Sequence, residues 1–129
     1  MLRRITRAVV LSLLIGIGAQ SLSAEFRVKE YQALKESSDP AQKALLEEYI
    51  NGVGQGISWA NSYLHSTNRQ RLYCAPENLA LNADNYEDML DRHIAKLAKT
   101  VTQEKLDGSF IGLVLLRALI ETFPCNVQK

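Results

Sequence analysis

The sequence predicts an all-α fold, a small single-domain bundle of about four helices with one intramolecular disulfide. Two observations lead to this prediction. Apolar residues recur every three or four positions in several segments that end at proline or at polar breaks, which is the spacing of amphipathic helices. The segment 109–122 is almost entirely apolar, which is typical of a helix buried on most sides.

Residues 1–24 predict a secretory signal peptide. Three arginines precede an apolar run, 8–19, and small, weakly polar residues follow as far as Ala24. The run is shorter than the roughly 20 residues that a membrane-spanning helix needs, so we expect no stable membrane anchor once the signal is cleaved. Cleavage after Ala24, or one residue earlier, leaves residues 25–129 as a helical domain in the periplasm.

Removal of the signal also changes the charge of the chain. The segment takes three arginines and no acids with it, so that twelve basic and fourteen acidic residues remain. A mildly acidic chain lacks the counterion release that drives binding to nucleic acid, and we expect no nucleic-acid partner. The remaining chain, about 105 residues, is long enough for one domain with one modest core.

Cys74 and Cys125 are the two cysteines of the chain. An even count in an exported protein predicts a disulfide, because the compartment is oxidising. Closing a loop of about fifty residues would constrain the unfolded chain by roughly 4 kcal/mol. A bond between two chains is the alternative, and a nucleophilic Cys74 with His65 or His93 as its base is the weaker hypothesis.

Two helices are expected in the first half of the domain. Apolar residues within 26–34 indicate a short first helix, which the polar segment 37–40 ends. Asp39 followed by Pro40 is typical of an N-cap with proline at the first helical position. This pair predicts a long second helix that reaches Leu64 or Ser66.

A third helix is expected after a break. The polar run 65–71 ends the second helix, and residues 72–82 indicate an irregular connector. Asp84 with Glu87 three positions later resembles a capping box, so we expect the third helix to begin there and to continue through about Thr100.

The last expected element is the apolar helix 109–122. We expect a polar loop at 102–108 to precede it. Pro124 cannot continue a helix and stops it, and Cys125 then joins its end to the connector.

The stretch 52–56 has glycine at every second position. A phosphate-binding loop would need a preceding strand with a lysine or a Gly-x-Gly-x-x-Gly spacing, and the stretch has neither. At about 100° per residue, Gly52, Gly56 and Ala60 form one ridge on the apolar side of a helix. This helix-packing ridge predicts a close crossing with the helix 109–122 or with a second copy, which leucine at Gly56 would damage. Gly54 has no packing role in this prediction.

Other chemistry is sparse in the sequence. Four acids at 84–91 indicate a solvated helix start rather than a calcium site, because the ligand spacing of a calcium loop is missing. We expect His93 to be a boundary or hydrogen-bonded core histidine. No Ser-His-Asp or metal-ligand spacing stands out, so we expect no enzyme, no metal and no cofactor.

Four segments in a fixed order resemble the Rap/Tai family of type VI secretion immunity proteins. These are "EEYINGVGQGI", "LYCAPENL", "YEDMLDRHIAKL" and "LVLLRALIETFPC", within about residues 46–125. The strongest motifs are Tyr73-Cys74-Ala75-Pro76 with Phe123-Pro124-Cys125. Members of this family are small, helical, exported proteins, often homodimers, that bind and block peptidoglycan-cleaving amidase effectors. The resemblance implies that Cys74 and Cys125 match the disulfide of the family.

Two functions follow as hypotheses. The first is a periplasmic inhibitor that occludes the active site of such an amidase with the polar loop 102–108, for which we expect Gln103, Glu104 and Asp107 as contact residues. The alternative is a general periplasmic stress or chaperone-like helical protein without a dedicated toxin partner. A carrier for a small ligand beside the glycine ridge is a third hypothesis, with no polar anchor set to favour it.

Overall fold

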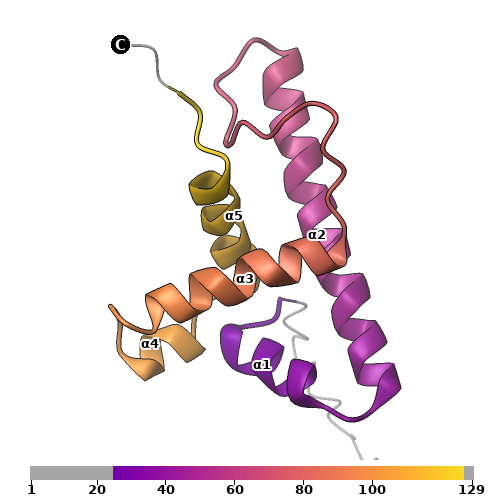
Figure 1. Ribbon diagram of the computed structural model, residues 1–129, viewed down its shortest axis with the longest axis vertical. Coiled ribbons are helices and arrows are strands. Elements are labelled where there is room, and N and C mark those ends of the chain that lie inside the picture. Colours follow the sequence, from indigo (N-terminus) through magenta and orange to yellow (C-terminus); the bar gives the residue numbers. More distant parts are fainter. Residues whose placement is uncertain (1–24, 127–129) are drawn as a thin grey trace, which may run out of the picture.

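The computed structural model describes residues 25–126, and the statements below concern that range (Figure 1). It has no strand there and five helices: α1 (Val28–Glu36), α2 (Pro40–Ser66), α3 (Ala83–Leu97), α4 (Gln103–Asp107) and α5 (Ile111–Thr122). The all-α prediction is confirmed, with five helices in place of about four. The predicted signal peptide, residues 1–24, lies outside the described range, as do residues 127–129.

Helix α3 lies across the molecule and joins its parts. It packs against both α2 and α5, while α1 contacts α2 and α4, and α2 also contacts α5. Figure 1 shows the long α2 along one side, α3 crossing it, and α4 at the opposite end of α3. The core between these helices consists mainly of aliphatic side chains and three tyrosines: Val28, Tyr31, Leu46, Ile50, Tyr73, Tyr86, Met89, Leu90, Ile94, Leu106, Ile111, Val114, Leu115, Ala118 and Leu119.

The helix starts follow local capping chemistry. Asp39 caps α2 as expected, because its carboxylate accepts a hydrogen bond from the Ala41 N–H at 2.9 Å. The expected cap of α3 at Asp84 is wrong. Asn82 and Asn85 instead bond reciprocally, each side-chain oxygen accepting the backbone N–H of the other at 3.1 Å. The third helix therefore begins at Ala83, and it ends at Leu97 rather than near Thr100.

The segment 102–108 is helical where we expected a polar loop. Thr102 caps the short helix α4 by accepting a hydrogen bond from the Lys105 N–H, and Leu106 is only 2% exposed. Burial of this one apolar side chain in the core stabilises a helical turn that the polar composition hides.

The glycine ridge does not form a crossing within the chain. Gly52, Gly56 and Ala60 are exposed, and a Cβ added to either glycine would meet nothing within 4 Å. Gly54 is buried instead, and a Cβ there would overlap the ring of Tyr86 on α3. The predicted crossing with the apolar helix is thus wrong within the chain, because the neighbouring helices cover the other side of α2. A crossing with a second copy stays a prediction.

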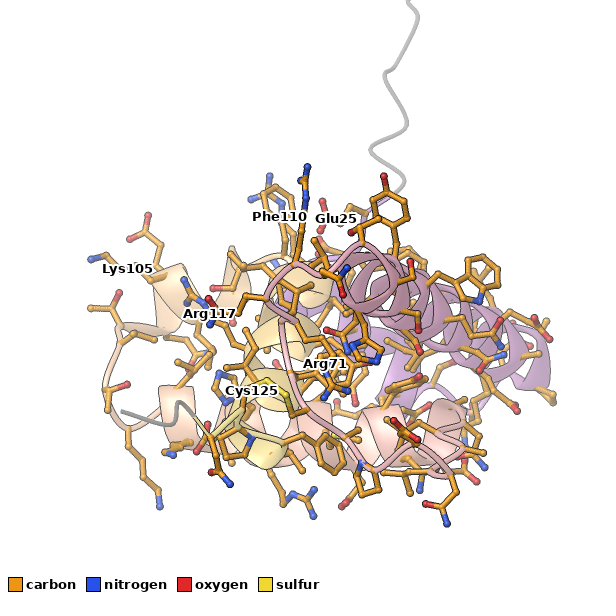
Figure 2. All side chains as sticks on the ribbon, turned by 90° about the horizontal axis from the view of Figure 1, so that it is seen from above. Glu25, Arg71, Lys105, Phe110, Arg117 and Cys125 are labelled. Carbon is orange, nitrogen blue, oxygen red and sulfur yellow. A yellow bond between two sulfur atoms is a disulfide. The ribbon has the colours of Figure 1, made fainter. Side chains whose placement is uncertain are left out.

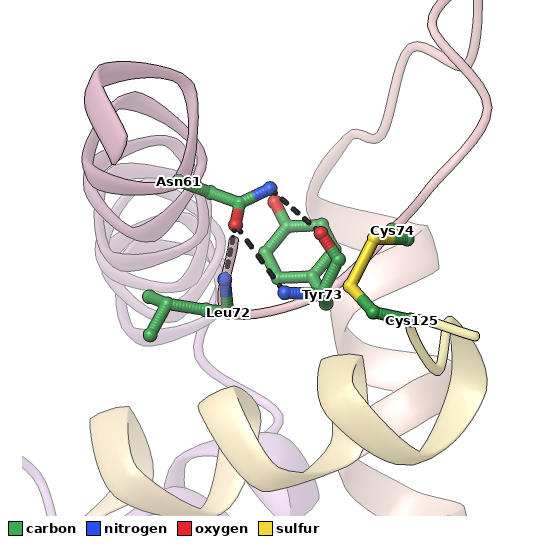
Figure 3. The surroundings of a disulfide bond; sticks show 5 residues. All are labelled: Asn61, Leu72, Tyr73, Cys74 and Cys125. Atoms are coloured by element: carbon green, nitrogen blue, oxygen red, sulfur yellow. Dashed lines mark hydrogen bonds between the residues drawn. A yellow bond between two sulfur atoms is a disulfide. The ribbon is translucent and has the colours of Figure 1, made fainter. Parts of the chain in front are cut away.

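The disulfide joins Cys74 to Cys125 within the chain, as predicted (Figure 3). The Cys74 N–H also donates to the Phe123 carbonyl at 2.8 Å, and the rings of Tyr73 and Phe123 lie 6.3 Å apart between centroids. These contacts attach the connector to the end of α5.

Between residues 25 and 126, no helix combines the length and the apolar character that crossing a bilayer requires.

Candidate functional site

One side of α2 is open to solvent although it carries large apolar side chains. Leu45, Trp59 and Tyr63 are 54%, 71% and 65% exposed. On a helix they lie within about 40° of one another, and the three small residues of the ridge share their side. We call this surface the outer face of α2 and define it by Leu45, Gly52, Gly56, Trp59, Ala60 and Tyr63.

The sequence interpretation missed this face. It placed Ala60 and the two glycines of the ridge on the apolar side of the helix and did not single out Trp59 or Tyr63. The helical spacing puts Trp59, Tyr63 and Leu45 on one side, so the pattern could have shown that they are buried or exposed together. It could not show which, because that depends on where α3 and α5 pack.

The C-terminal half of α2 is held in place by Asn61, a buried polar residue. Its side-chain oxygen accepts from the N–H groups of Leu72 at 2.7 Å and Tyr73 at 3.3 Å. Its amide nitrogen donates to the Tyr73 carbonyl at 3.0 Å (Figure 3). A buried side chain with both ends satisfied orients its neighbours strongly. The connector therefore lies at a fixed distance from α2, beside the disulfide.

A groove of about 430 Å³ lies between α2 and the connector, beside the hydrogen bonds of Asn61. Tyr73 and Tyr86, both buried, lie among its lining residues, and Trp59 borders it on the side of the outer face. Figure 2 places Arg71, another lining residue, between the layers of α2 and α3. Burial raises the pKa of the Tyr86 hydroxyl, and the nearby Tyr73 raises it further, so this group stays protonated at neutral pH.

The predicted contact residues Gln103, Glu104 and Asp107 lie on α4, at the far end of α3 from α2 (Figure 1). The Gln103 amide donates to the Asp107 carboxylate at 2.6 Å, so two of the three side chains bond to each other. Gln103 and Glu104 are exposed and Asp107 is half-buried. Their role in binding a partner stays a prediction.

His93 lies on α3 and is half-buried facing α5, which confirms the boundary position, one of the two that we expected. Its Nδ1 is 2.9 Å from a carboxylate oxygen of Glu121, and Lys96 pairs with the other oxygen. The hydrogen bond from Lys96, and then that from His93, lower the pKa of the Glu121 carboxyl. His93, Lys96 and Glu121 together link α3 to α5.

The hypothesis of a nucleophilic Cys74 is not supported, because the sulfur of Cys74 is bonded in the disulfide.

Two of the acids at the start of α3, Asp88 and Asp91, are paired with cations or a hydroxyl. Asp88 contacts Arg92, one turn further along α3, at 2.7 Å. Asp91 accepts from the Tyr31 hydroxyl at 2.8 Å and pairs with Lys35. Burial, and then the bond to Asp91, raise the pKa of Tyr31. This cluster fastens α1 to α3.

Comparison of the chain with family models, curated proteins and solved structures gives no match in any of the three. In the described part of the chain, the fold and its surfaces define a disulfide-bonded helical domain in which α2 has an open apolar face. The resemblance to the Rap/Tai family rests on the sequence motifs.

Proposed function

We propose that the protein is an immunity-type binding protein of the periplasm, which inhibits a peptidoglycan amidase effector of a type VI secretion system by occluding its active site. The outer face of α2 carries the binding part of this proposal. The sequence motifs carry the identity of the partner.

The outer face has the chemistry of a protein-binding surface. Soluble proteins seldom expose contiguous large apolar side chains unless these contact another protein or a ligand. Trp and Tyr are also the residue types that contribute most at interface centres. Trp59 and Tyr63 are separated by one helical turn, with the flat glycine positions beside them to receive side chains of a partner.

The rigid frame behind this face supports the same function. The disulfide and Asn61 fix the connector against α2, so the exposed side chains sit on a preorganised helix. Binding then requires little ordering, which favours high affinity. A disulfide is also consistent with an oxidising compartment such as the periplasm.

Growth rescue tests the proposal. The protein is co-expressed in the periplasm with candidate amidase effectors, and its growth-rescuing effect is recorded for each. The affinity is then measured for every effector whose toxicity the protein prevents. We expect the double variant Leu45→Ala/Tyr63→Ala to weaken binding at least tenfold, because both side chains lose interface contacts. Ile120→Ala is the matched control, since this residue is also exposed but lies on α5.

The α4 residues are tested in the same assay with Gln103→Ala/Glu104→Ala/Asp107→Ala. Loss of affinity in this variant alone would show that α4, rather than α2, contacts the effector. Absence of rescue and of a complex with any amidase would contradict the inhibitor function. Suppressed aggregation of many unrelated proteins would then indicate the chaperone-like alternative. A dimer that dissociates in Leu45→Ala/Tyr63→Ala, at unchanged amidase affinity, would assign the outer face to a second copy.

A further inference from the structure

The groove beside α2 contains two buried tyrosines whose hydroxyls have no partner. The Tyr73 and Tyr86 residues are 3% and 2% exposed, and both line the groove. Neither hydroxyl bonds another described residue. Between residues 25 and 126, Nε2 of His93 is the one fully buried side-chain polar atom without a hydrogen-bond partner, so both tyrosine hydroxyls keep some contact with solvent. Both tyrosines line the groove, and each hydroxyl can donate and accept a hydrogen bond.

The rest of the lining is polar and nearly balanced in charge. It includes Gln55, Ser58, Ser62, His65, Arg71 and Glu77. The amide and hydroxyl groups suit a ligand with many neutral donors and acceptors. Arg71 and Glu77 carry opposite charges, so the groove does not select for a strongly charged ligand.

Trp59 adds an aromatic surface at the border of the groove. Its side chain lines the groove and is 71% exposed. An indole ring offers a large apolar face with one polar N–H. A sugar ring matches such a surface, because one side of the ring presents C–H groups while its edges carry hydroxyls.

We propose that this groove binds a neutral mono- or disaccharide, with Trp59 under the apolar side of a ring and the Tyr73 and Tyr86 hydroxyls bonded to its edge. The volume of about 430 Å³ lies within the range of small-molecule sites, roughly 300–1,000 Å³. The groove shares Trp59 with the outer face of α2, whereas Tyr73 and Tyr86, whose hydroxyls bond the sugar, lie outside that face, so sugar binding and inhibition can be tested separately.

Fluorescence provides a direct test, since Trp59 is the one tryptophan in the sequence. The disulfide-bonded protein is titrated with N,N′-diacetylchitobiose and with cellobiose. We expect a saturable change in emission with at least one of them. Tyr73→Phe/Tyr86→Phe retains both rings and removes both hydroxyls, so it should weaken binding about tenfold. Tyr63→Phe makes the same change outside the groove and should leave the affinity unchanged.

Ser58→Ala/Ser62→Ala is the second groove variant, because these residues belong to the wall rather than the core. It should weaken binding even if the tyrosine variant fails to fold. The proposal is overturned if neither sugar changes the emission, or if neither groove variant lowers the affinity. It is also overturned if groove variants impair capture of an amidase while no sugar binds, since the groove would then belong to a protein interface. Failure of Leu45→Ala/Tyr63→Ala to affect amidase capture would not bear on the sugar site.

Discussion

At the residue scale, two glycines only two positions apart lie on opposite sides of α2 and have opposite roles. Gly54 faces the Tyr86 ring, whereas Gly56 faces open space. Alanine at Gly54 must displace the ring, and overpacking of this kind costs about 1–3 kcal/mol. Alanine at Gly56 avoids the entropy cost of glycine in a helix and should stabilise by about 0.5–1 kcal/mol. Urea unfolding of Gly54→Ala and Gly56→Ala measures both.

The glycine pair also controls for helix propensity, because both changes occur inside α2. Equal shifts in the unfolding midpoint would show that Tyr86 does not restrict Gly54. Leucine at Gly56 should leave folding intact, because a Cβ there would meet nothing within 4 Å. We therefore expect Gly56→Leu to weaken only an assembly with a second copy.

Asn61 provides a second residue-scale prediction. Alanine there leaves two N–H groups and one carbonyl of the connector without their partner. Buried groups left unsatisfied cost about 1–3 kcal/mol each, partly relieved by water, so we expect Asn61→Ala to lose about 2–4 kcal/mol of unfolding free energy. Asn51→Ala on the same helix is the control and should change it by less than about 0.5 kcal/mol. Similar losses in the two variants would contradict the role of Asn61.

At the scale of elements, Glu121 links α5 to α3 through Lys96 and His93. The pKa of this carboxyl is lowered in the folded chain, so its charged form stabilises the fold above the pKa of the unfolded chain. That contribution is lost as the pH falls through the lowered folded pKa, below the ordinary value of 4.5. Glu121→Gln should be less stable at neutral pH, and its difference from the parent should vanish in acid. Unfolding measured from pH 7 to pH 3 checks the expected convergence.

Elements with strong local chemistry could be predicted from the sequence. The start of α2 followed from Asp39 and Pro40, whose effects act within one turn, and its end followed from the polar run 65–71. Helix α4 could not be predicted, because it depends on Leu106 reaching a core built by distant segments. The cap of α3 was misplaced by two residues, since a pair of asparagines was overlooked beside acids with a similar spacing.

The surfaces of the whole molecule were less predictable than its elements. The period of α2 groups Trp59, Tyr63 and Leu45, but only the packing of α3 and α5 determines that this group faces solvent. The groove needs Tyr86 from α3 beside Tyr73 from the connector, a juxtaposition without local signal. The disulfide could be predicted because two cysteines allow one intramolecular pairing.

At the scale of the whole molecule, the disulfide closes a loop that contains α3, α4 and α5, with a sequence separation of 51 residues. Reduction restores the entropy of that loop to the unfolded chain and should cost up to about 4 kcal/mol, a large part of the stability of a small domain. We expect thermal unfolding of the monomer to shift strongly downward in reductant. A Cys74→Ala/Cys125→Ala variant should melt at the same lowered temperature with and without reductant. An unchanged melting temperature would contradict the intramolecular bond, and a covalent dimer that reduction converts to monomers would place the bond between chains.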